Sequence, residues 1–194
     1  MKLFQEYRGL KKESYILVLG RMVTSMGSMV WPMMTLILRV KMKMSPTAIA
    51  TLIMFAAFAA VPLNLIGGKL ADHFIRKNII IICDTISIIG FLFCAFHALD
   101  YTALTIFIIA GLLQGMEGPS YSALVADLVS SKDRERVYSL QYLGNNIGLI
   151  MAPIIGGFLF SRHLQLLFLI NAMAIATSTV IIAIGLKNVK NADA

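Results

Sequence analysis

The sequence has little charge, few cysteines and a single tryptophan. Charged residues make up 14% of its 194 residues, and it contains two cysteines, five prolines and one tryptophan. Soluble domains carry about 25% charged residues, so this composition argues against one. Cys83 and Cys94 lie eleven residues apart in one apolar stretch, which is about 16 Å along a helix. That separation excludes a disulfide between them.

The sequence also lacks the motifs of common enzymes. It contains no G-x-S-x-G and no H-E-x-x-H, which would indicate a hydrolase serine or a catalytic zinc. His73, His97 and His163 fall in three separate connections between apolar stretches. These absences predict that the chain is not an enzyme, and we expect no metal and no cofactor.

What the sequence does contain is long apolar runs. Hydrophobic residues make up 58% of the chain, and its mean hydropathy is +0.80. Six segments are long enough to cross a bilayer as helices: Tyr15–Leu38, Thr47–Ile66, Ile79–Phe96, Ala103–Leu124, Val137–Phe160 and Leu164–Leu186. The predicted fold class is therefore an all-α membrane protein with six transmembrane helices. Residues 15–186 would form the bundle, residues 1–14 a cytoplasmic segment and residues 187–194 a cytoplasmic tail.

The net charge of +7 is a topology signal. With a cytoplasmic N-terminus, twelve lysines and arginines lie inside: Lys2, Arg8, Lys11, Lys12, Lys69, Arg76, Lys77, Lys132, Arg134, Arg136, Lys187 and Lys190. Four lie outside, namely Arg39, Lys41, Lys43 and Arg162. This asymmetry follows the positive-inside rule and places both termini in the cytoplasm of a plasma (inner) membrane protein. It argues against nucleic acid as a partner.

A charged connection follows the second apolar segment. The pair Gly67–Gly68 predicts a tight reversal there, with the turn extending to Asn78. Asp72 and Arg76 are four residues apart and would face each other on a helical start. Asp72 could also cap a nearby helix, and Asp127 is a second possible partner of Arg76. Solvated loop charges that only set topology are the alternative.

Three stretches, in order along the chain, resemble motifs of the major facilitator superfamily. GKLADHFIRK (residues 68–77) is similar to G-x-x-x-D-(R/K)-x-G-(R/K)-(R/K) in the loop between helices two and three, with a histidine and an isoleucine as departures. GLLQG (residues 111–115) resembles the helix-four motif R-x-x-Q-G with glycine in place of arginine. GLIMAPIIGG (residues 148–157) resembles the helix-five antiporter motif G-x-x-x-G-P-x-x-G-G. Residues 126–140 are similar to the loop between helices four and five of drug:proton antiporters.

The resemblance implies the N-terminal six-helix half of the superfamily fold. It implies a secondary transporter that couples efflux of small amphipathic compounds to proton entry by alternating access. A conformational gating motif would comprise Gly68, Asp72, Arg76, Lys77 and Asp127. The antiporter-like motif of helix five would comprise Gly148, Pro153, Gly156 and Gly157. Expected partners are the lipid bilayer, a small-molecule substrate, protons, and a second six-helix half or another copy of the chain.

Three ionisable residues lie inside the apolar segments. An intramembrane charge is a functional candidate that needs a partner. We expect Arg21 to pair with Glu117, the candidate proton carrier, and Asp84 to reach toward headgroups, because the resemblance implies that the third helix is peripheral. A structural ion pair is the alternative for Glu117. Candidate substrate contacts are Gln114, Asn145 and Asn146, with Met29 and Trp31 lining an apolar pocket.

The length leaves three interpretations open. Transporters of this kind have two six-helix halves with the substrate between them. The chain could therefore be a fragment, a half-transporter that pairs with another chain, or a non-transporting remnant, and we favour the first. The alternative function is a six-helix membrane interaction or scaffold protein without transport.

Overall fold

The computed structural model describes residues 7, 9–160 and 162–186. These residues form helices and contain no strand. The elements are α1 (Lys12–Gly27), α2 (Val30–Leu36), the π-helix η1 (Ile37–Lys41), α3 (Pro46–His73), α4 (Arg76–Phe96), α5 (Tyr101–Leu128), α6 (Ser131–Phe160) and α7 (Leu164–Gly185). Six helical spans, the first comprising α1, α2 and η1, are long and apolar enough to cross a membrane. The predicted fold class is confirmed, while the tail 187–194 and residues 1–6 and 8 lie outside the described residues.

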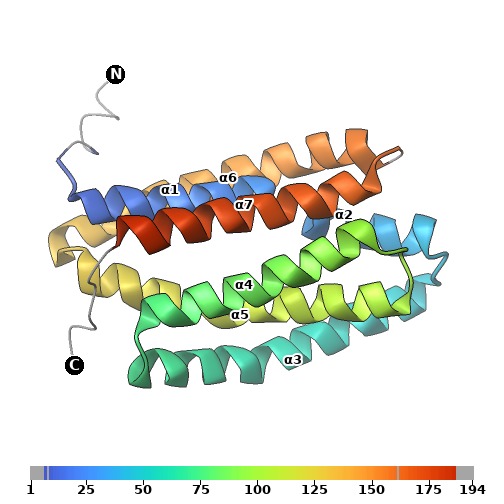
Figure 1. Cartoon of the computed structure of the whole chain (residues 1–194), viewed down its shortest axis with the longest axis horizontal. Coiled ribbons are helices and arrows are strands. Elements are labelled where there is room, and N and C mark those ends of the chain that lie inside the picture. Colours follow the sequence, from blue (N-terminus) through green and yellow to red (C-terminus); the bar gives the residue numbers. More distant parts are fainter. Residues whose placement is uncertain (1–6, 8, 161, 187–194) are drawn as a thin grey trace.

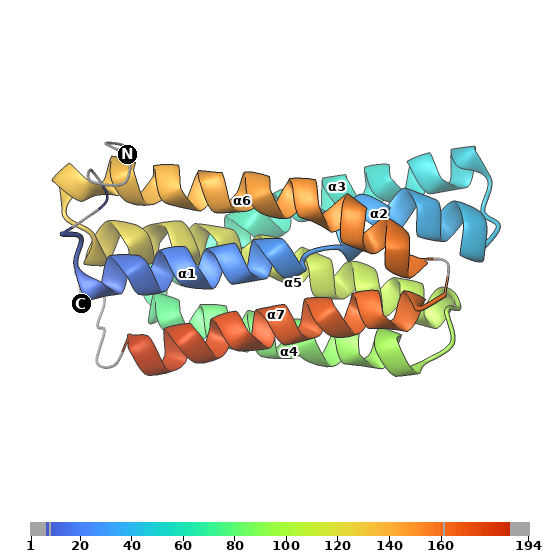
Figure 2. The same cartoon turned by 90° about the horizontal axis from the view of Figure 1, so that it is seen from above.

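Six of the helices form two groups of three. Helix α1 packs against α6 and α7, and α5 packs against α3 and α4. The contact between α4 and α7 joins the groups (Figures 1 and 2). Helix α1 begins and α7 ends at the same end of the bundle, together with the α3–α4 and α5–α6 connections (Figure 1). We call this the near end and the opposite one the far end.

Two apolar clusters fill the interior. One, toward the far end, includes Phe91, Phe107 and Phe168. The other, toward the near end, includes Leu17 and Val125. On α1, α4, α5 and α7 the residues of the two clusters are separated along the helix by a polar position, namely Arg21, Asp84, Glu117 and Thr179. The fold thus places a polar belt between two apolar layers.

The first span is broken, whereas the sequence predicted one helix over Tyr15–Leu38. Helix α1 ends at Gly27 and α2 begins at Val30. The break puts Pro32 in the first turn of α2, where a missing N–H costs no helical hydrogen bond. At Gly27 an added methyl group would overlap the side chain of Ala174. The end of α1 therefore packs directly on α7.

The second span is longer than predicted. Gly67 and Gly68 lie inside α3, which runs on to His73, so the predicted reversal at this glycine pair is wrong. Gly67 is buried against the backbone carbonyl of Met116 on α5, a contact that any Cβ would obstruct. The glycine serves close helix packing, and Phe74 and Ile75 alone connect α3 to α4. Asp72 consequently sits in the last turn of α3, and the N-cap of α4 is Ile75, without a side-chain cap.

Alanine substitutions at the two adjacent glycines of α3 should have different effects on the stability of the fold. Gly67→Ala is expected to destabilise the fold by about 1–3 kcal/mol, because the methyl group must push α3 away from α5. Gly68→Ala is the matched control, since an added methyl group meets nothing within 4 Å there. Alanine favours the helix over glycine by up to about 1 kcal/mol, so this variant should be neutral or more stable. Thermal unfolding in detergent measures both, and equal shifts would contradict the packing role.

Candidate functional site

The polar belt contains an ion pair between a partly exposed arginine and a buried glutamate. Arg21 Nη1 on α1 lies 3.7 Å from Glu117 Oε1 on α5, and the two side chains are 35% and 5% exposed. The Arg21 guanidinium also lies over the Tyr121 ring, 5.4 Å from its centroid. The other carboxyl oxygen, Glu117 Oε2, is buried and accepts no hydrogen bond from the described residues. The structure thus brings together the two intramembrane charges that were expected to pair.

Asp84 belongs to the same belt. It is 4% exposed, and its Oδ2 accepts a 2.6 Å hydrogen bond from Thr179 Oγ1 on α7. Its carboxyl also lies within hydrogen-bonding reach of the Glu117 carboxyl. The expectation that Asp84 reaches toward headgroups is wrong, because α4 lies between α5 and α7 and turns this residue inward. Four helices therefore supply the belt.

A pocket of about 550 Å³ opens beside the ion pair. Its lining comes from α1, α2, α6 and one of the two residues between α1 and α2: Arg21, Ser25, Ser28, Trp31, Pro32, Asn145, Gly148 and Leu149. Asn145 Oδ1 accepts a hydrogen bond from the Ser25 hydroxyl. Arg21 is shared by the pocket and the ion pair, so it links the open space to the buried carboxyls.

The other candidate contacts lie elsewhere. Gln114 is half-buried and lies outside the pocket lining. Asn146 donates a 2.7 Å hydrogen bond to the carbonyl of Tyr142 in its own helix. Met29 is buried in the far-end apolar cluster, so its expected place on a pocket wall is wrong. Of the predicted site residues, the pocket lining contains Arg21, Trp31 and Asn145.

Trp31 explains the glycine at position 111. A methyl group added at Gly111 would overlap the Trp31 indole, which also packs on Phe107 with ring centroids 4.8 Å apart. The indole occupies the space into which an α5 side chain would project. An arginine at position 111 would therefore have to displace Trp31.

The antiporter-like motif forms the contact between α6 and the first span. An added methyl group at Gly148 would collide with the Ser25 carbonyl, and one at Gly156 would meet Met33 Cγ at 3.0 Å. Pro153 is exposed inside α6, and Gly157 faces open space. Gly148 and Gly156 thus bring α6 close to α1 and α2, next to the pocket.

The near end carries the charges of the predicted gating motif. Arg76, at the start of α4, forms an ion pair with Asp127 near the end of α5, and the side chains are 10% and 11% exposed. Arg76 Nε also donates a 3.2 Å hydrogen bond to the Ala71 carbonyl at the end of α3. Asp72 is exposed, and Gly68 faces open space. The Arg76 guanidinium therefore connects the ends of three helices.

Lys77 joins α4 to the end of α7. Its Nζ donates 2.8 Å hydrogen bonds to the carbonyls of Ala183 and Leu186, where helical carbonyls lack partners of their own. Lys77→Met should lower the free energy of unfolding by about 1–3 kcal/mol. Lys69→Met, at an exposed position of α3, is the control for loss of charge alone. Equal thermal shifts for both variants would contradict the capping role.

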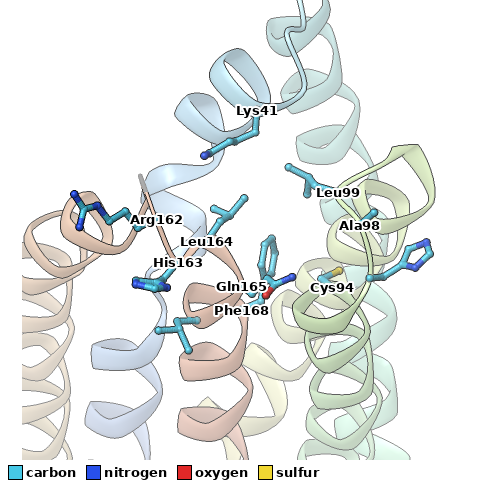
Figure 3. A pocket seen from close by; sticks show the side chains of 11 residues that line it. Lys41, Cys94, Ala98, Leu99, Arg162, His163, Leu164, Gln165 and Phe168 are labelled. Carbon is cyan, nitrogen blue, oxygen red and sulfur yellow. The ribbon is translucent and has the colours of Figure 1, made fainter.

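A second pocket, of about 510 Å³, lies at the far end. Figure 3 shows Lys41 of η1 and Arg162 and His163 of the α6–α7 connection across from Ala98 and Leu99 of the α4–α5 connection. Beside this pocket, the Ala103 backbone N–H donates a hydrogen bond to Asp100 Oδ1, and His97 Nε2 lies 3.4 Å from Asp100 Oδ2. The hydrogen bond from Ala103, together with His97, lowers the pKa of the Asp100 carboxyl. Nothing in the predicted site residues pointed to this pocket. The sequence indicated only that the three polar connections around this pocket lie on the same side of the predicted topology.

Across residues 7, 9–160 and 162–186, no three His, Cys, Asp or Glu side chains gather in a group that could hold a metal ion.

Comparisons with known proteins agree with this architecture. An uncharacterized MFS-type transporter of Bacillus subtilis, YqjV, is 26% identical over 174 residues, which is 88% of this chain and 41% of that protein. A Na(+), Li(+), K(+)/H(+) antiporter of Planococcus maritimus is 29% identical over 119 residues, covering 58% of this chain and 28% of that protein. The chain thus spans less than half the length of these relatives.

Solved structures show the same fold. The peptide transporter POT, crystallised with alafosfalin, matches 89% of this chain and 37% of its own with a TM-score of 0.73 and 17% identity. A D-xylose–proton symporter matches 94% of this chain and 49% of its own with a TM-score of 0.64 and 16% identity. Residues 17–193 match the sequence profile of the Major Facilitator Superfamily. This integral membrane protein belongs to the Major Facilitator Superfamily.

Proposed function

We propose that the chain is the N-terminal six-helix half of a proton-coupled secondary transporter that exports small amphipathic compounds by alternating access. The observation that carries the proposal is the Arg21–Glu117 pair, in which a buried carboxyl inside a membrane-spanning helix pairs with an arginine that lines an open pocket. Burying charges in hydrocarbon is costly, and such residues usually serve transport or proton transfer. Glu117 is the proton carrier in this proposal.

The pocket supports amphipathic compounds as substrates. Trp31 offers an aromatic face, while Ser25 and Asn145 offer hydrogen-bonding groups on the facing helices α1 and α6. An apolar body with a polar group would match this lining. The cation/proton antiporter of Planococcus maritimus supports proton antiport as the coupling mode.

A second six-helix unit would complete the cavity. Substrate sites of such transporters lie between two halves that rock against each other, and this chain supplies one wall. A separate half or another copy of the chain would supply the other. In the proposed topology both termini are cytoplasmic, so the near end with Arg76 and Asp127 faces the cytoplasm of a plasma membrane protein.

Transport in vesicles tests the function. The chain would be reconstituted together with its second six-helix unit in inverted orientation, and an acidic interior should drive accumulation of a fluorescent amphipathic cation. A protonophore should abolish this accumulation. Failure of this assembly to move any compound tested, although the two units bind each other stably, would instead favour the scaffold function.

Trp31 offers a separate test of substrate binding, since it is the only tryptophan and lines the pocket. An amphipathic compound that occupies the pocket is expected to shift or quench its fluorescence in a saturable way. Asn145→Leu, which removes a polar group from the lining, should weaken the apparent affinity. An unsaturable response, unchanged by Asn145→Leu, would contradict binding in this pocket.

A further inference from the structure

The charges of the polar belt do not balance. Asp84 and Glu117 each present a carboxyl to the same buried space, and each residue is 4% exposed. Within the described part of the chain, Arg21 is the only cation whose charge acts on both carboxyls. Fully ionised, the three groups would leave one net negative charge inside the bundle. Two neighbouring carboxyls in such a site cannot both ionise readily, because their charges repel and burial disfavours both.

The hydrogen bonds of the belt show where a proton would fit. Asp84 Oδ2 shares the single hydroxyl proton of Thr179 with the Ile175 carbonyl, and Glu117 Oε2 is buried and accepts nothing from the described residues. The two carboxyls lie within hydrogen-bonding reach of each other. Two carboxylates offer only acceptors, so one proton is the donor that this pair lacks.

From this geometry we propose that Asp84 and Glu117 share one proton and form a neutral triad with Arg21 at rest. The inference rests on the proposed function for its biological role, and it extends the proton site from Glu117 to a pair on two helices. Binding and release of this proton form and break only an O–H bond of a carboxyl, and no other covalent bond changes. The pair titrates as a unit, so the proton belongs to both residues.

The position of Arg21 links the triad to the pocket. Its side chain is 35% exposed and lines the pocket beside Ser25 and Asn145. A second proton on the pair would leave the Arg21 charge without a counter-charge, facing the open space. Proton occupancy of the pair therefore sets the charge that the substrate pocket presents.

Arg21 also disfavours an alkali cation in place of the proton. A sodium ion between the carboxyls would stand close to the guanidinium and be repelled by it. The other titratable groups that face the pair are Cys83 on α4 and Tyr121 on α5. A thiol and a phenol are neutral around pH 7 and leave the charge count unchanged.

Infrared difference spectroscopy of the purified full chain at pH 7 tests the proposal. A protonated carboxyl gives a carbonyl stretch that carboxylates lack and that shifts in D₂O. The wild type should show this band at an intensity of one carboxyl per chain. Asp84→Asn and Glu117→Gln should each abolish it, because the remaining carboxyl is balanced by Arg21. A band that survives either substitution, or is absent from the wild type, would overturn sharing.

Further arms test the charge balance and the ligand. Arg21→Gln should raise the band to about two carboxyls per chain, and no increase would overturn the charge argument. Replacing choline by sodium should leave the band unchanged, whereas its loss would show an alkali cation at the pair.

Glu135→Gln, at an exposed carboxyl of α6, is the control variant and should leave the band unchanged. Circular dichroism checks that each variant folds. The infrared band is measured on purified protein and does not depend on transport. If the band is present but the vesicles show no transport, only the proposed function is refuted.

Discussion

Glutamine in place of Glu117 is expected to abolish proton-driven accumulation in vesicles, down to the level of protein-free vesicles. Glutamine keeps the size and one carbonyl of the side chain, but it cannot take up and release a proton. The residue is buried next to Arg21 at the pocket, so the substitution removes proton exchange at the point where it would affect substrate. The measurement is accumulation of a fluorescent amphipathic cation under an imposed pH gradient.

Glu135→Gln is the matched control. Glu135 is exposed near the start of α6, away from the polar belt, so its loss should leave accumulation at the wild-type level. Binding of the compound, followed by Trp31 fluorescence, should persist in Glu117→Gln. Unchanged coupling in Glu117→Gln would remove this residue from the mechanism.

Removing the guanidinium of Arg76 should produce the largest loss of stability. Arg76→Met leaves Asp127 with a side chain that is 11% exposed and without its ion-pair partner. Breaking a buried pair from one side costs about 3–5 kcal/mol, because the remaining charge stays desolvated. Loss of the bond to the Ala71 carbonyl also loosens the α3–α4 connection. Thermal unfolding in detergent measures the effect.

A double variant separates charge from packing at this site. Arg76→Met with Asp127→Leu should recover part of the stability, since it removes the unpaired carboxylate as well. Asp133→Asn serves as the comparison, because it breaks the half-exposed pair with Arg136 and should have a much smaller effect. A midpoint for Arg76→Met close to that of Asp133→Asn would refute the buried ion pair.

The six spans and their order were predictable because hydrophobicity acts locally. About 20 apolar residues are needed to cross a bilayer, and each run meets that requirement without reference to its neighbours. Helix ends were less predictable. The sequence ended the second span at Ile66, but α3 continues to His73. Gly67 and Gly68 alone do not reveal whether they serve a turn or a close helix contact.

The site was predictable only in part. Arg21 and Glu117 stand out as charges in apolar runs, and their opposite signs favour a pair. The inward position of Asp84 depends on which neighbours enclose α4, and that is set by its contacts with α5 and α7. Likewise, no local signal shows that the Trp31 indole occupies the space beside Gly111.

Taken by itself, the sequence determined the membrane class, the six spans and the family, because each follows from composition or from short motifs. Only the tertiary structure decided that four helices meet at one polar belt, that Asp84 joins Glu117 there, and that Arg21 connects the belt to a pocket. These features depend on distances between residues up to 158 positions apart, from Arg21 to Thr179. Such distances arise from helix packing, which hydropathy along the chain does not encode.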